Sequence, residues 1–132
     1  MTTCPTWKEL KAIVRGGESK IKAFLESLPD EHKTAGALAL SVAHWDPSER
    51  TWIRARLLDR AYGRHCGLCH LFYPDPGCKA CPLGKSGHIC STHAGDIWGG
   101  IVYSSDKRGF NRAADRMYNV LVYLYRQEWE KL

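Results

Sequence analysis

The sequence has no hydrophobic run long enough to cross a lipid bilayer. Its longest apolar stretch without a charged residue is 35–43, whereas a membrane-spanning helix needs roughly 20 such residues. The first residues also lack a basic segment followed by an apolar one, the pattern of a secretory signal peptide. We therefore expect a cytoplasmic protein without a membrane partner, in which clustered cysteines hold a metal ion more often than a disulfide.

Catalytic signatures are also lacking. The zinc-protease motif H-E-x-x-H, the deaminase pair H-x-E and P-C-x-x-C, the P-loop and G-x-G-x-x-G do not occur, so we expect no enzymatic activity.

A hydrophobic fraction of 44% and a charged fraction of 25% exclude a disordered chain. The length of 132 residues predicts a single domain. Its expected parts are N-terminal helices over 1–62, a cysteine-rich metal-binding segment over 63–100 and a C-terminal helix over 105–131.

The positive charge is concentrated in the middle of the chain. Residues 50–93 carry seven basic and only two acidic side chains, and they also hold five of the six cysteines. This surplus is suited to a polyanionic partner, whose counterions the cations would release. It would equally offset the negative charge of a thiolate cluster around a divalent ion, and we favour this second interpretation.

The periodicity of apolar residues predicts a mainly helical fold. Apolar positions spaced three and four residues apart indicate helices over 6–16, 19–29, 31–44, 46–62 and 105–131. In the fourth helix the arginines alternate with two opposed apolar faces, so this helix has no continuous basic face. Residues 63–100 are rich in glycine and proline and predict a loop that something other than a hydrophobic core must order. A short strand is expected at 101–103.

Two Cys-x-x-Cys pairs in the loop-rich segment predict a metal site. Each pair can place two sulfurs on one ion, and two pairs complete a tetrahedral zinc shell at about 2.3 Å per sulfur. Glycines beside the pairs would give the backbone freedom that such turns need. Structural zinc can add on the order of 10 kcal/mol to folding, enough to order such a segment. Five candidate ligands compete for four positions: Cys66, Cys69, Cys78, Cys81 and Cys90.

Other metal chemistries fit part of this pattern. Cys81-Pro82 is typical of iron–sulfur proteins, so a [4Fe–4S] cluster is an alternative to Zn²⁺. Cys66-Gly-Leu-Cys69-His70 matches the haem-attachment motif, but haem would leave the second Cys-x-x-Cys pair unexplained. A dithiol redox centre needs a strand–helix context that the flanking residues do not predict. Nearby histidines are alternative ligands: His65, His70, His88 and His93.

The cysteine spacing resembles that of a known group. The motifs are Cys66-x-x-Cys69 beside Leu71-Phe72-Tyr73, then Cys78-x-x-Cys81-Pro82-Leu83, Gly87, Cys90 and Thr92, followed by Trp98 and a closing amphipathic helix. Over about residues 50–126 the chain resembles small Cys-rich proteins encoded in tailed-phage and prophage genomes. The resemblance implies a virus-encoded accessory protein that acts inside a bacterial cell, and it implies no particular substrate.

These observations predict a mainly α fold: a helical domain with a loop-rich, zinc-knuckle-like insert and a long C-terminal amphipathic helix. The expected function is stoichiometric binding of a host protein, which the protein modulates or inhibits. The alternatives are a nucleic-acid-binding zinc protein and an iron–sulfur protein with a redox or enzymatic role. We expect the contact surface to consist of basic and aromatic residues around the metal: Arg54, Arg60, Arg64, Phe72, Tyr73, Lys79, Lys85 and His88.

Overall fold

The structure is a computed structural model that describes residues 5–61, 65–72, 81–86, 101 and 106–132. Within these ranges the regular structure is helical and contains no strand, which confirms the expected mainly α class. The helices are α1 (Trp7–Gly16), α2 (Glu18–Glu26), α3 (Lys33–His44), α4 (Arg50–Ala55), α5 (Leu57–Arg60), α6 (Gly67–Phe72), α7 (Pro82–Lys85) and α9 (Lys107–Glu130). Single 3₁₀ turns, Asp30–His32 and Pro47–Glu49, precede α3 and α4. None of the described helices is long and apolar enough to span a bilayer.

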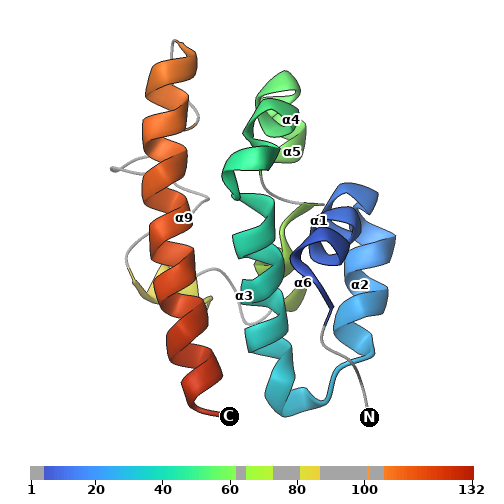
Figure 1. Cartoon of the computed structure of the whole chain (residues 1–132). Coiled ribbons are helices and arrows are strands. Elements are labelled where there is room, and N and C mark those ends of the chain that lie inside the picture. Colours follow the sequence, from blue (N-terminus) through green and yellow to red (C-terminus); the bar gives the residue numbers. More distant parts are fainter. Residues whose placement is uncertain (1–4, 62–64, 73–80, 87–100, 102–105) are drawn as a thin grey trace.

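Helix α3 lies at the centre of the molecule. It packs against α9 on one side and against α1 and α6 on the other (Figure 1). The middle of α3 is buried on every face, and alanines at 37, 39 and 43 alternate with Leu38, Leu40 and Val42. Small side chains let neighbouring helices approach closely, while the larger ones fill the space between them. The apolar core therefore forms around a single helix.

The first two helices begin and end where the sequence indicates. The Thr6 side chain accepts a hydrogen bond from the Glu9 backbone N–H (3.1 Å), and Glu9 accepts one from the Thr6 backbone N–H (3.3 Å). This capping box satisfies two N–H groups that the first turn leaves without partners. Gly17 ends α1 with a φ of 83°, a conformation that favours glycine, and its N–H donates to the Val14 carbonyl (3.1 Å). The helices expected over 6–16, 19–29 and 31–44 thus correspond to α1, α2 and α3.

The prediction of one continuous helix over 46–62 is wrong. The backbone leaves the helical conformation at Arg56 (φ −142°, ψ 64°), which separates α4 from α5. The apolar residues of this segment lie on two opposed faces, and one straight helix can bury only one of them. Ile53 before the break and Ala61 after it both lie in the core, while Trp52 is half-buried.

The segment expected to be a loop contains two short helices, α6 and α7. Gly67 in α6 serves close packing rather than an unusual backbone angle. A Cβ atom on Gly67 would lie 3.0 Å from the Ala37 carbonyl oxygen and 3.1 Å from the Leu40 Cβ. Ile101, where a strand is expected, is helical and fully buried, and the rest of 101–103 lies outside the described residues.

Helix α9 packs against α3 and α7. The Asp106 side chain caps it by accepting a hydrogen bond from the Gly109 backbone N–H (2.7 Å). Its buried side follows the spacing of an amphipathic helix and consists of Phe110, Ala113, Ala114, Met117 and Leu121. An ion pair between Arg50 and Asp115 also joins α4 to α9. The C-terminal helix is thus held by an apolar stripe and by a charged contact near its start.

We predict that Gly67→Ala destabilises the protein, because the added methyl group presses α6 away from α3. Overpacking of this kind typically costs about 1–3 kcal/mol, which chemical denaturation followed by circular dichroism measures. Gly16→Ala is the control, since its Cβ would meet only the exposed Lys20 side chain (Cγ at 2.5 Å), which can turn into solvent, whereas the Ala37 backbone beside Gly67 cannot move away alone. Equal stability of Gly67→Ala and wild type would contradict the close contact between α6 and α3.

Candidate functional site

The structure describes three of the five candidate metal ligands. Cys66 directly precedes α6, Cys69 lies in its first turn, and Cys81 is the residue at the N-cap of α7. All three are half-buried, and Cys66 and Cys81 pack against the apolar core. The first Cys-x-x-Cys pair thus continues into a helix, where residues three apart lie on the same face. Cys66 and Cys69 are therefore suited to hold one ion together.

The described residues do not by themselves complete a metal site. Within 5–61, 65–72, 81–86, 101 and 106–132, no group of three or more His, Cys, Asp or Glu side chains is placed to hold an ion. Cys78 and Cys90, the other two candidate ligands, lie outside these ranges, as do His88 and His93. The thiolates that are described fit zinc or an iron–sulfur cluster in donor chemistry.

Two buried histidines lie beside the first cysteine pair. His65 donates from Nδ1 to the Val14 carbonyl (2.7 Å), and His44 on α3 donates from Nε2 to the Arg60 carbonyl (2.5 Å). The pKa of His44 is lowered from 6.5 to about 4, chiefly by burial; His65 also lowers it, whereas the hydrogen bond to the Arg60 carbonyl and the nearby Cys69 act in the opposite direction. His44 is therefore neutral at neutral pH, and its N–H joins the end of α3 to α5.

Trp52 connects several elements near these histidines. The guanidinium groups of Arg60 and Arg15 lie 4.5 Å and 5.2 Å from the centre of its ring, and His65 meets the ring edge-to-face at 5.0 Å. Arg60 also donates to the Trp52 carbonyl (2.8 Å), and Arg15 forms a bidentate pair with Glu49 (2.7 and 3.1 Å). These contacts hold α1, α4 and α5 together, so Arg60 is engaged within the protein.

The other residues of the expected contact surface are dispersed. Arg54 and Lys85 are exposed on different helices, whereas Phe72 is half-buried against the core. Arg64, Tyr73, Lys79 and His88 lie outside the described residues. Of this set, the structure thus describes two exposed cations, one on α4 and one on α7.

Sequence reasoning missed an aromatic cluster that joins the first and last helices. Trp7 meets Tyr125 edge-to-face at 6.0 Å, and Tyr125 stacks on Trp129 at 6.3 Å. Exposure is 47% for Trp7 and 50% for Trp129, and the neighbouring Tyr123 is 61% exposed. The spacing of Tyr125 and Trp129 signals a pair on one face of a helix. Nothing in the sequence indicates that Trp7 joins them.

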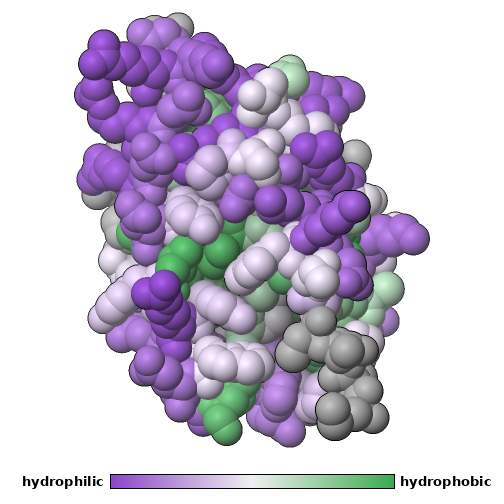
Figure 2. All heavy atoms as spheres, in the orientation of Figure 1, coloured by the Kyte–Doolittle hydropathy of each residue, from purple (hydrophilic) through white to green (hydrophobic). Residues whose placement is uncertain are grey.

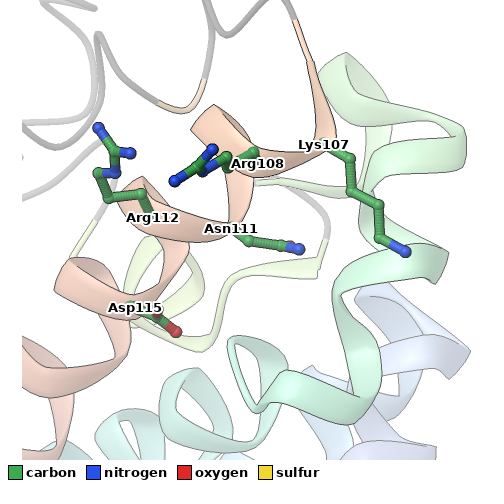
Figure 3. A pocket seen from close by; sticks show the side chains of 5 residues that line it. All are labelled: Lys107, Arg108, Asn111, Arg112 and Asp115. Carbon is green, nitrogen blue, oxygen red and sulfur yellow. The ribbon is translucent and has the colours of Figure 1, made fainter.

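A second feature that the sequence did not reveal lies at the other end of α9. Two adjoining hollows, of about 330 and 540 Å³, share Lys107 and Asn111. Arg50, Thr51, Arg54 and Ala55 of α4 complete the lining of the first, and Arg108, Arg112 and Asp115 that of the second. Figure 3 shows Lys107 reaching from α9 toward α4. Hydrophilic side chains crowd this end of the molecule (Figure 2). In the sequence, the basic residues at 107, 108 and 112 are the feature from which this cationic region could have been predicted.

Comparisons of the chain with family models, with curated proteins and with solved structures find no match in any of the three.

We predict that replacing both Cys66 and Cys69 by serine lowers the metal bound per chain by at least half. A cysteine thiolate binds zinc far more strongly than a serine hydroxyl does. The zinc site and the iron–sulfur alternative both need this cysteine pair. Elemental analysis of anaerobically purified protein measures the metal and distinguishes zinc from the iron of a cluster. Cys4→Ser is the control. Unchanged metal content in the double variant would contradict a role of this pair in metal binding.

We predict that stability falls between pH 6.5 and about pH 4 because of His44, whose folded pKa is about 4. In this range His44 is protonated in the unfolded chain but stays neutral in the folded protein. This difference lowers the free energy of unfolding by about 3 kcal/mol. Above pH 6.5 this contribution is fully present. His44→Gln keeps an N–H donor but does not titrate, so its stability should fall less steeply in denaturant titrations. Parallel pH profiles of the two proteins would contradict the assignment.

Proposed function

We propose that this protein is a small zinc-stabilised helical module that binds another protein and modulates or inhibits it. The observation that carries this proposal is the aromatic cluster of Trp7, Tyr125 and Trp129, in which the two tryptophans are about half exposed. The resemblance of the chain to Cys-rich phage and prophage proteins supports a virus-encoded accessory role, with a protein of the bacterial host as the partner. The place of action in this proposal is the host cytoplasm.

Aromatic side chains of this kind are suited to protein recognition. Tryptophan and tyrosine bury a large area with few rotatable bonds, and they are enriched among the residues that contribute most to binding energy. Here the mutual contacts of Trp7, Tyr125 and Trp129 restrict their rings before any partner arrives. Less side-chain entropy is then lost when a partner covers them.

The metal has a structural role in this proposal. Helix α6 packs on α2 and α3, whereas α7 packs on α9. Cys66 and Cys69 belong to the first of these units, and Cys81 belongs to the second. An ion shared by these cysteines and completed by Cys78 or Cys90 would connect α6 to α7. Four sulfur ligands leave no position for a substrate water, which favours binding over metal-dependent hydrolysis.

Nucleic acid is the second candidate partner, because of the exposed cations at the start of α9. Lys107, Arg108 and Arg112 are exposed there, and Arg54 of α4 faces the same hollow as Lys107. Phosphate contacts release counterions, so binding through these residues would weaken steeply as salt rises. Binding through the aromatic cluster would depend little on salt. The salt dependence of binding therefore distinguishes the two candidates.

We predict that the double variant Trp7→Ala and Trp129→Ala loses partner binding while remaining folded. Affinity purification from host cells, with quantitative mass spectrometry, should recover one host protein in near-stoichiometric amount with wild type and at least tenfold less with the variant. Purified partner then gives the dissociation constant directly. Lys22→Ala with Glu26→Ala, on the exposed face of α2, is the matched control.

Retention of the same partner by the double tryptophan variant, at unchanged affinity, would contradict the proposed surface. Binding of mixed-sequence DNA or RNA that disappears at high salt, with no protein partner recovered, would favour the nucleic-acid candidate instead.

A further inference from the structure

We propose that the hollow between α4 and α9 is a binding site for a phosphate group, with the Arg50 guanidinium as its principal ligand. This site lies at the start of α9 (Figure 1), whereas Trp129 lies in the last turn of that helix. It is thus separate from the aromatic cluster, and neither feature depends on the other.

Arg50 is the unusual residue of this region. Only 8% of its surface is exposed, and its Nη1 atom pairs with Asp115. Its Nε and Nη2 atoms are buried and have no hydrogen-bond partner among the residues that the structure describes. Buried donors without partners are rare because they lose hydration and gain nothing in return. In a protein with 132 residues and a packed core, this exception indicates a ligand that the guanidinium is built to meet.

The two unsatisfied atoms define the shape of that ligand. Nε and Nη2 form one edge of the planar guanidinium and donate two nearly parallel hydrogen bonds, an arrangement that matches two oxygens of a phosphate or carboxylate group. Asp115 pairs with the guanidinium at Nη1, and because Nε and Nη2 are buried, the guanidinium has to turn before this edge faces the hollow. The Asp115 side chain is 62% exposed, so it can move as the guanidinium turns its donor edge toward the hollow.

The lining of the hollow favours phosphate over a single carboxylate. Arg54 and Lys107 add two further positive charges, and neither forms an ion pair with any residue that the structure describes. The hydroxyl of Thr51 and the amide of Asn111 supply neutral donors. Since Asp115 offsets only Arg50, the hollow keeps an excess of about two positive charges, which suits a doubly charged phosphate. Its volume of about 330 Å³ holds such a group with room for water.

Inorganic phosphate is the probe for a direct test. Titration at constant ionic strength, with chloride replaced by phosphate, should shift the ¹H–¹⁵N resonance of the Arg50 side chain in a saturable manner. Arg50→Lys keeps one positive charge but loses the two-pronged edge, so its affinity should fall at least tenfold. Lys107→Gln changes an exposed residue and should weaken binding about threefold to tenfold. Lys20→Gln, on α2 outside the hollow, should leave the affinity unchanged.

Oligonucleotides with and without a 5′-phosphate distinguish the two sources of this group. A preference for the 5′-phosphorylated strand that Lys107→Gln removes would assign the site to a terminal phosphate on a nucleic acid. Equal binding of both strands, together with saturable binding of inorganic phosphate, would assign it to free phosphate. The proposal is overturned if phosphate and chloride give the same linear shifts, or if Lys107→Gln binds phosphate as tightly as wild type does.

Discussion

The burial of α3 on all of its faces is the constraint on which the rest of the structure depends. Helices α1, α6 and α9 all pack against it, and this is possible because small side chains alternate with leucines along its length. Helix α6 has only six residues and α7 only four, far below the length at which isolated helices are stable in water. These short helices therefore exist through their contacts: α6 through Gly67 against α3, and α7 through its packing on α9.

Local sequence signals predicted the elements whose structure is decided locally. The capping box at Thr6, the glycine at 17 and the apolar spacing over 31–44 each identify a boundary or a buried face within one helix. The break at Arg56 was not predictable in this way, because no glycine or proline lies in 50–61 to mark it. The helical structure of 67–72 was also not predicted. In the sequence Gly67 indicates a turn, and only the close contact with α3 shows that this glycine serves packing within a helix.

The candidate sites differ in the same way: some features are set by residues close in the sequence, and others by contacts between distant segments. Cysteine spacing identifies candidate ligands because a Cys-x-x-Cys pair is a local arrangement, and Cys66 and Cys69 indeed lie within one helical turn. Contacts between distant segments carry no local signal. Trp7 meets Tyr125 only because α1 and α9 are both part of the same bundle, and Arg50 meets Asp115 only because α4 lies beside the start of α9. The resulting surfaces place aromatic residues at one end of α9 and cations at the other.

The central proposal is that a metal ion held by the cysteines joins α6 to α7, the two short helices that carry Cys66, Cys69 and Cys81. Hydrogen exchange, followed by mass spectrometry before and after removal of the metal with a chelator, tests it most directly. The account predicts that amides of 66–72 and 81–86 lose protection at least tenfold, while those of α1 and the middle of α3 change little. Unchanged protection of both cysteine-bearing segments after complete loss of the metal would contradict it.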